Sequence, residues 1–154
     1  MPKYHGDEEY INRFKKSLGY AKDSRNIRIS ITGRSSAGIF GLIPFVTLIS
    51  EMKNACIFNL SLEEDGFLII QAKKLSGELL NQTLFIAHHE LAETRIIKGS
   101  LEHQLIFTLK TGETLNFNLG TKIIGIPYQN ENATYLIEMI EQKNKSNQKN
   151  DIFI

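Results

Sequence analysis

Short stretches in which apolar and polar residues alternate dominate the middle of this chain. Residues 105–109 and 115–119 both carry apolar side chains at every second position, and Thr111-Gly112 separates them. Residues 56–62 alternate in the same way and lead into Asp65-Gly66, a strong hairpin signal. A period of two places one face of a strand in a core and the other in water. The sequence therefore predicts a domain built mainly of antiparallel hairpins.

Further stretches of similar character predict strands at residues 27–32, 67–72, 83–87 and 94–98, with a loop at residues 75–81. A meander of short strands cannot bury both of its faces by itself. It has to form a sandwich or close into a barrel. The expected fold class is therefore mainly β.

Two helices are expected, one on each side of this β-region. The first spans residues 7–22 and sets an apolar stripe against a basic side, namely Tyr10, Ile11, Phe14 and Leu18 against Arg13, Lys15 and Lys16. In the second, residues 133–140 carry apolar side chains at helical spacing, and Asn130 or Asn132 is available as N-cap. From Lys143 onward the chain is polar and low in complexity, which favours a frayed tail.

Charge is spread unevenly along the chain. The 154 residues suit one domain, and 18 Lys and Arg against 17 Asp and Glu argue against a polycation built for nucleic acid. Residues 1–34 carry eight basic and four acidic residues, residues 35–50 carry no charge, and residues 51–142 carry seven basic and twelve acidic residues. The near-zero net charge therefore hides a basic start, an uncharged connector and an acidic body.

These patterns divide the chain into a basic helical arm at residues 1–26, a β-domain at 27–143 and a flexible polar tail at 144–154. The β-domain contains an apolar connector, residues 35–50. At sixteen residues the connector is short for a membrane-spanning helix, which needs about 20, and two glycines and a proline interrupt it. A buried core segment is favoured, and a segment that dips into a membrane surface or a partner is the alternative.

Location and chemistry follow largely by elimination. The first 26 residues are polar and basic, so no secretory signal is expected. We expect a cytoplasmic protein, with peripheral attachment to the inner membrane surface as the alternative. Cys56 is the only cysteine, which excludes an internal disulfide, a cysteine-based zinc site and an iron–sulfur cluster.

His88, His89 and Glu90 form the one cluster that could hold a metal ion. Neighbouring strand residues point to opposite faces, and Glu93 stands where a zinc protease has its second histidine. We expect His88 and His89 to lie exposed at a strand end, and we expect no catalytic residue, no cofactor and no metal. The alternative function is a small metal-dependent or ligand-binding β-barrel protein that uses this region.

Three segments carry a resemblance to a known family: the hairpin of residues 57–70, the hairpin of residues 105–119 with its glycine turn, and the helix around residues 135–140. Together they resemble the bacterial pleckstrin-homology-like (PH-like) domain family over residues 55–142. The resemblance implies a partly open seven-stranded barrel closed by a C-terminal α-helix, here preceded by an N-terminal helix. It also implies a binding or self-assembly module rather than an enzyme.

Members of the wider superfamily that bind phosphoinositides hold the headgroup with Lys and Arg along the first hairpin loop. The connector that corresponds to this loop carries no charge except Glu51 just after it, so specific headgroup binding is not expected.

Two candidate surfaces follow from these patterns. The exposed apolar residues of the connector would form an interaction surface for a protein partner or a second copy of the chain. These residues are Ile39, Phe40, Leu42, Ile43, Phe45 and Val46. The basic residues of the arm and the first strand would contact an anionic membrane surface. These residues are Lys15, Lys16, Lys22, Arg25, Arg28 and Arg34. A nucleic-acid partner is not expected, because aromatic residues hardly interleave with these bases.

Overall fold

The described part of the chain is mainly β, with one helix before the sheet and one after it. The computed structural model describes residues 4, 6–20, 24–31 and 57–152, and it describes side chains up to residue 146. The expected fold class is confirmed at this level. The elements are α1 (Glu8–Ser17), β1 (Arg25–Ser30), β2 (Ile57–Leu62), β3 (Gly66–Ala72), β4 (Leu79–Ala87), the 3-10 turn η1 (His88–Glu90), β5 (Leu91–Ile97), β6 (His103–Leu109), β7 (Thr114–Leu119) and α3 (Gln129–Ile152).

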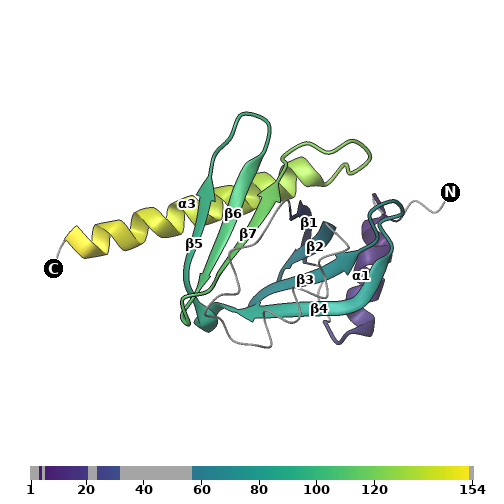
Figure 1. The fold of residues 1–154 in the computed structure, drawn as a ribbon, viewed down its shortest axis with the longest axis horizontal. Helices are drawn as coiled ribbons and strands as arrows, with labels where there is room; N and C mark the ends of the chain where they lie inside the picture. The colour runs from purple at the N-terminus through teal and green to yellow at the C-terminus, as the bar shows by residue number, and fades with distance from the viewer. Residues whose placement is uncertain (1–3, 5, 21–23, 32–56, 153–154) are drawn as a thin grey trace.

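The seven strands form one antiparallel sheet in the order β4-β3-β2-β1-β7-β6-β5. In one half, β1 pairs with β2, β2 with β3 and β3 with β4, and in the other half β5 pairs with β6 and β6 with β7. The strands of the two halves run across one another (Figure 1). The consecutive strands β4 and β5 lie at opposite ends of the order, so the sheet is not closed.

The largest differences from the predicted strands lie at the starts of β4 and β5. β4 begins at Leu79, inside the loop expected at residues 75–81, and β5 begins at Leu91, three residues before the expected start. Register shifts interrupt the pairing of β4 with β3 and of β5 with β6. An irregular register breaks the period of two on which the sequence prediction depended.

α1 forms where the sequence supplies both a start and a stop. The side chain of Asp7 accepts a hydrogen bond of 3.1 Å from the backbone N–H of Tyr10, which caps the first turn. Gly19 has a φ of 100°, a left-handed conformation that suits glycine and ends the helix. α1 therefore stops at Ser17, five residues before the predicted end.

Two hydrophobic clusters lie on opposite faces of the sheet. The larger lies between the two halves of the sheet and α3, and its aromatic centre contains Phe58, Phe107 and Phe117. The smaller contains Ile11 of α1 and Leu68 of β3. β3 is buried along its whole length because its alternate residues serve the two clusters in turn.

α3 runs ten residues beyond its expected end. A frayed tail was predicted from Lys143, but the backbone is helical to Ile152, so the predicted end is wrong. Residues 143–152 contain no glycine or proline to stop the helix. Asn144 also donates a hydrogen bond of 3.2 Å to the carbonyl oxygen of Thr94, which holds the helix against β5.

The two halves of the sheet meet at a narrow seam. Among the described residues, β1 and β7 share one paired position, Ser30 with Asn118. Beside it, the buried amide of Gln129 accepts a hydrogen bond of 2.8 Å from the N–H of Arg28 and donates one of 2.9 Å to its carbonyl. The same amide donates to the carbonyl of Gly120 at 2.7 Å. A side chain of α3 therefore replaces the strand partner that β1 lacks there.

Asn132, about one helical turn after Gln129, forms further hydrogen bonds between α3 and β1. Its amide donates to the carbonyl of Asn26 at 2.9 Å and accepts from the guanidinium of Arg25 at 2.9 Å. α3 already begins at Gln129, so neither Asn130 nor Asn132 serves as the N-cap that the sequence suggested. Their side-chain amides could have capped the helix, but the amide of Asn132 forms hydrogen bonds with β1 instead.

Replacing Gln129 should weaken the whole fold. We predict that Gln129→Ala lowers the free energy of unfolding by about 3 kcal/mol, because it leaves buried backbone groups of β1 and of residue 120 unpaired. The control Asn130→Ala, at the exposed neighbouring position, should change it by less than about 0.5 kcal/mol. Urea denaturation followed by circular dichroism measures both. Equal stability of the two variants would contradict the role given to the seam.

Candidate interaction surface

A buried lysine fastens α1 to the sheet. Lys15 is only 1% exposed, and its ammonium group donates hydrogen bonds of 2.9 Å to Ser24 Oγ, Asn26 Oδ1 and Ser61 Oγ. The carboxylate of Glu63 accepts hydrogen bonds from both serine hydroxyls. A buried charge costs several kcal/mol unless it is paired and hydrogen-bonded. Here the hydroxyls link the cation to a carboxylate, so the charge is satisfied.

The burial of Lys15 corrects one part of the predicted membrane contact. The sequence predicted Lys15 beside Lys16 on the outer side of the first helix. Lys16 is exposed, but Lys15 follows Ile11 by one helical turn and therefore shares its buried face. Lys15 cannot contact an outside surface. The spacing from Ile11 was the signal that could have revealed this.

Three of the other predicted basic residues, Lys16, Arg25 and Arg28, are described, and they differ in exposure and contacts. Arg25 lies over the ring of Tyr135, 4.2 Å from its centroid, and is also hydrogen-bonded to α3. Arg28 is half-buried, and burial lowers the pKa of its guanidinium. Of the four predicted residues that the structure describes, Lys16 alone is exposed. Lys22 and Arg34 lie outside the described residues.

The predicted apolar interaction surface lies outside the described residues as a whole. It consists of Ile39, Phe40, Leu42, Ile43, Phe45 and Val46 in the connector. It stays a prediction.

His88 and His89 are exposed at the end of β4, as expected. The ring of His88 packs edge-on against Phe67 with centroids 5.5 Å apart. Glu90 accepts a hydrogen bond of 3.2 Å from the backbone N–H of Ala87. Within the described ranges, no three His, Cys, Asp or Glu side chains converge where they could hold a metal ion.

Sequence reasoning missed the most exposed aliphatic residues of the described chain. Leu75 is 95% exposed in the β3–β4 hairpin, and Ile124 is fully exposed in the loop between β7 and α3. Lys73 and Lys74 directly precede Leu75, and the exposed Lys122 lies two residues before Ile124. We call these five residues the loop face. Nothing in their periodicity distinguishes them from ordinary loop residues.

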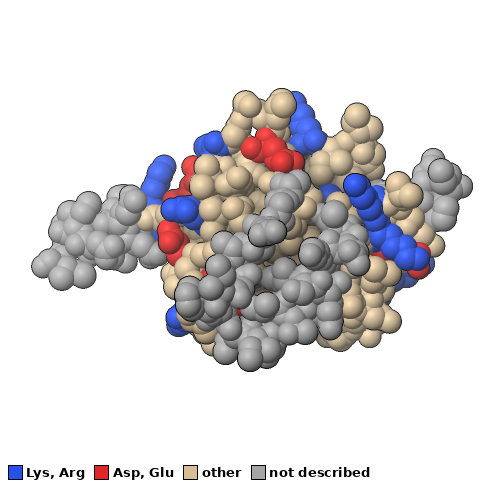
Figure 2. All heavy atoms as spheres, viewed as in Figure 1, with Lys and Arg blue, Asp and Glu red and all other residues tan. Residues whose placement is uncertain are grey.

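Packing beneath the loop face holds its two loops at one end of the molecule. Ile126 belongs to the same buried cluster as Ala72 and Leu79, which flank the β3–β4 hairpin. In Figure 1, the hairpin and the β7–α3 loop both lie at the end where α1 packs. Figure 2 shows Lys and Arg side chains at this end, at the right of the view. Leu75 and Ile124 therefore project from one end of the fold.

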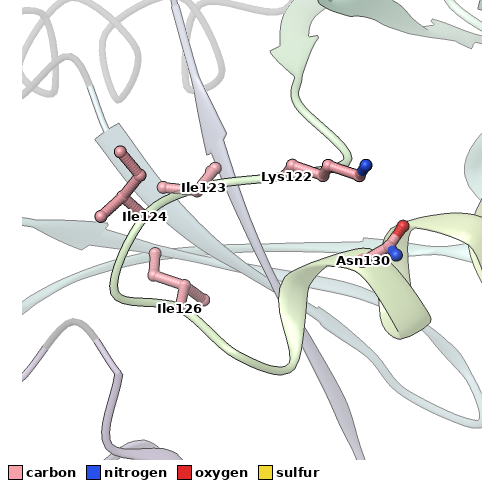
Figure 3. Close-up of a pocket in the computed structure, with 5 residues that line it drawn as sticks. All are labelled: Lys122, Ile123, Ile124, Ile126 and Asn130. Carbon is pink, nitrogen blue, oxygen red and sulfur yellow. The ribbon is translucent and has the colours of Figure 1, made fainter.

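A shallow hollow of about 250 Å³ opens beside Ile124. Figure 3 shows Ile123, Ile124 and Ile126 from the loop on one side, with Lys122 and Asn130 on the other. The hollow therefore has an apolar wall and a polar wall. Such a surface suits a partner with both an apolar and a polar or charged part.

The loop that carries Ile124 packs against the N-terminal segment. Gly125 adopts a φ of 85°, which reverses the chain, and a side chain at Gly6 would collide with the carbonyl oxygen of Gly125. Tyr128 is buried, and this burial raises the pKa of its phenol to about 12, against the opposing effect of Arg28. The N-terminal segment and the loop therefore pack closely against each other.

Comparison with known proteins does not assign the chain to a family. No protein-family model matches the chain, and no curated protein matches it significantly. The resemblance to PH-like domains therefore stays a prediction from the sequence. As for membrane insertion, neither described helix combines the length and the apolar character needed to cross a bilayer.

Removing the buried ammonium should loosen α1. We predict that Lys15→Met lowers the free energy of unfolding by about 3 kcal/mol, because the carboxylate of Glu63 and the two hydroxyls lose their cation. Lys16→Met, the exposed neighbour, should have an effect below about 0.5 kcal/mol. Chemical denaturation of both variants tests this. A Lys15→Met protein as stable as the wild type would contradict it.

Burial of Tyr128 should make stability fall at high pH. The folded protein keeps the phenol proton up to about pH 12, whereas the unfolded chain loses it near pH 10. The free energy of unfolding should therefore decrease from pH 10 to pH 12, by at most about 2–3 kcal/mol. In Tyr128→Phe this part of the decrease should vanish. Identical pH profiles of the two proteins would refute the prediction.

Proposed function

We propose that the chain is a PH-like β-domain that acts as a non-catalytic binding module at an anionic membrane surface, on its cytoplasmic side. The seven strands followed by a helix support the PH-like part, because the sequence resemblance implies seven strands and a C-terminal helix. The loop face supports the membrane part.

The observation that carries the proposal is that the exposed aliphatic side chains lie next to lysines in the same loops. Leu75 and Ile124 would each gain about 1.5–3 kcal/mol on complete burial in an apolar phase. A lysine close to an anionic surface contributes about 1 kcal/mol. Lys73, Lys74 and Lys122 supply this attraction, and Glu78, 3.1 Å from Lys73, offsets part of it. The sum favours weak and reversible binding.

The charge distribution also favours one orientation on the membrane. Residues 51–142 carry twelve acidic and seven basic residues, so most of the β-domain would be repelled by an anionic surface. The loop face combines three of those seven basic residues with two apolar side chains. It is therefore the end that would point toward the lipid. The cytoplasmic leaflet is the anionic one in cells.

Vesicle binding tests the proposal. We predict that the purified chain sediments with vesicles rich in phosphatidylglycerol and not with pure phosphatidylcholine vesicles. Binding should weaken with salt, because the Debye length falls from about 10 Å at 0.1 M to about 3 Å at 1 M. The double variant Leu75→Asp/Ile124→Asp should lose binding. Both positions are exposed, so the fold should be kept.

Leu101 provides a matched control. It is 93% exposed in the β5–β6 loop, next to Glu102 and without the lysines of the loop face. Leu101→Asp should bind anionic vesicles as the wild type does. Absence of wild-type binding at low salt would refute the membrane function. Loss of binding in Leu101→Asp as large as in the double variant would refute the assignment to the loop face.

A further inference from the structure

The two edges of the sheet are finished in different ways. β4 and β5 are the terminal strands of the order, so each has backbone groups that no further strand of the sheet can pair. Unpaired edges invite pairing with another chain, and proteins usually guard them with charges or with a covering element. A difference between the two edges therefore indicates where association is permitted.

The β5 edge is guarded. It carries Glu93 and Arg95, and Lys98 follows it in an ion pair of 3.0 Å with Glu141 of α3. The carbonyl oxygen of Thr94 already accepts the hydrogen bond from α3 described above. Another strand would have to displace α3 and bury charged side chains to pair here.

Among the residues that the structure describes, the β4 edge has neither safeguard. Its nine residues, Leu79–Ala87, include no charged residue and no proline. Described side chains close its two ends. The N–H of Leu79 donates to the hydroxyl of Tyr10 at 2.9 Å, and the N–H of Ala87 donates to Glu90 at 3.2 Å. Both contacts use backbone groups that point away from β3.

Between these ends, no strand of the described ranges other than β3 pairs with this edge. The N–H of His88 donates to the carbonyl of Asp65 at 2.9 Å, which fixes the alternation along β4. Along an antiparallel strand, the backbone groups of successive residues point alternately toward and away from the partner strand. Because the N–H of His88 points toward β3, the N–H and C=O groups of Phe85 and Thr83 point away from it. In the part of the chain that the structure describes, β3 is the only strand paired with β4.

We propose that β4 pairs with β4 of a second copy of this chain, antiparallel, about a two-fold axis. A two-fold axis perpendicular to a strand reverses its direction, so the pairing continues both sheets with the antiparallel geometry that they already have. The uncharged sequence makes the contact free of like-charge repulsion, which a strand carrying charges of one sign could not offer to its own copy.

The mass of the protein in solution tests this. Sedimentation equilibrium of the wild type should give a mass that rises with concentration from 17.5 kDa, that of one chain, to twice that value. Gln82→Lys places a charge at an exposed β4 position and should raise the dissociation constant about tenfold or more. Ala92→Lys, an exposed position on β5, should leave it unchanged.

Amide hydrogen exchange provides a measurement that needs no variant. The amides of Thr83 and Phe85 should exchange more slowly as the concentration rises, whereas amides of β5 should not change. A monomer at all concentrations, or a dimer weakened equally by Gln82→Lys and Ala92→Lys, would overturn the proposal. Since no lipid is present in these experiments, their failure would leave the membrane function untouched, and failure of vesicle binding would leave the dimer untouched.

Discussion

The amide of Gln129 is the interaction on which the rest of this structure depends. The two half-sheets share one paired position among the described residues, and a buried side chain of α3 adds a second link through three hydrogen bonds to backbone groups. If those backbone groups were buried without a partner, the free-energy cost would exceed the net stability that the hydrogen bonds themselves contribute. The position of α3 across the seam is therefore fixed by polar pairing as well as by its apolar face.

The same link shapes the candidate surface. Because Gln129 bonds to Gly120, it closes the loop between β7 and α3 at its base, and Ile124 lies at the far side of that loop. Gly6, just before α1, packs against the loop from the other side, and the buried cation of Lys15 fixes α1. The buried polar groups of Gln129 and Lys15 thus help to hold the loop in which the side chain of Ile124 is exposed to solvent. Such rigidity lowers the entropic cost of docking.

The sequence predicted what depends on periodicity and missed what depends on tertiary contacts. Alternation located the β-strands, and helical spacing located α3. The burial of Lys15 could be found only by noticing that it shares a face with Ile11. The roles of Gln129 and Ile124 left no local signal, because each depends on residues distant in the chain. The end of α3 was missed because a polar segment looks the same whether it frays or packs on a neighbouring strand.

Amide hydrogen exchange at Arg28, followed by NMR, tests the central claim most directly. The N–H of Arg28 faces the seam and donates to Gln129, whereas the other edge of β1 pairs with β2. The account predicts that this amide exchanges as slowly as those of Ile27 and Ile29 in the same strand, although no strand pairs with it. Exchange at the rate of an exposed loop amide would contradict the claim that a side chain of α3 completes the sheet.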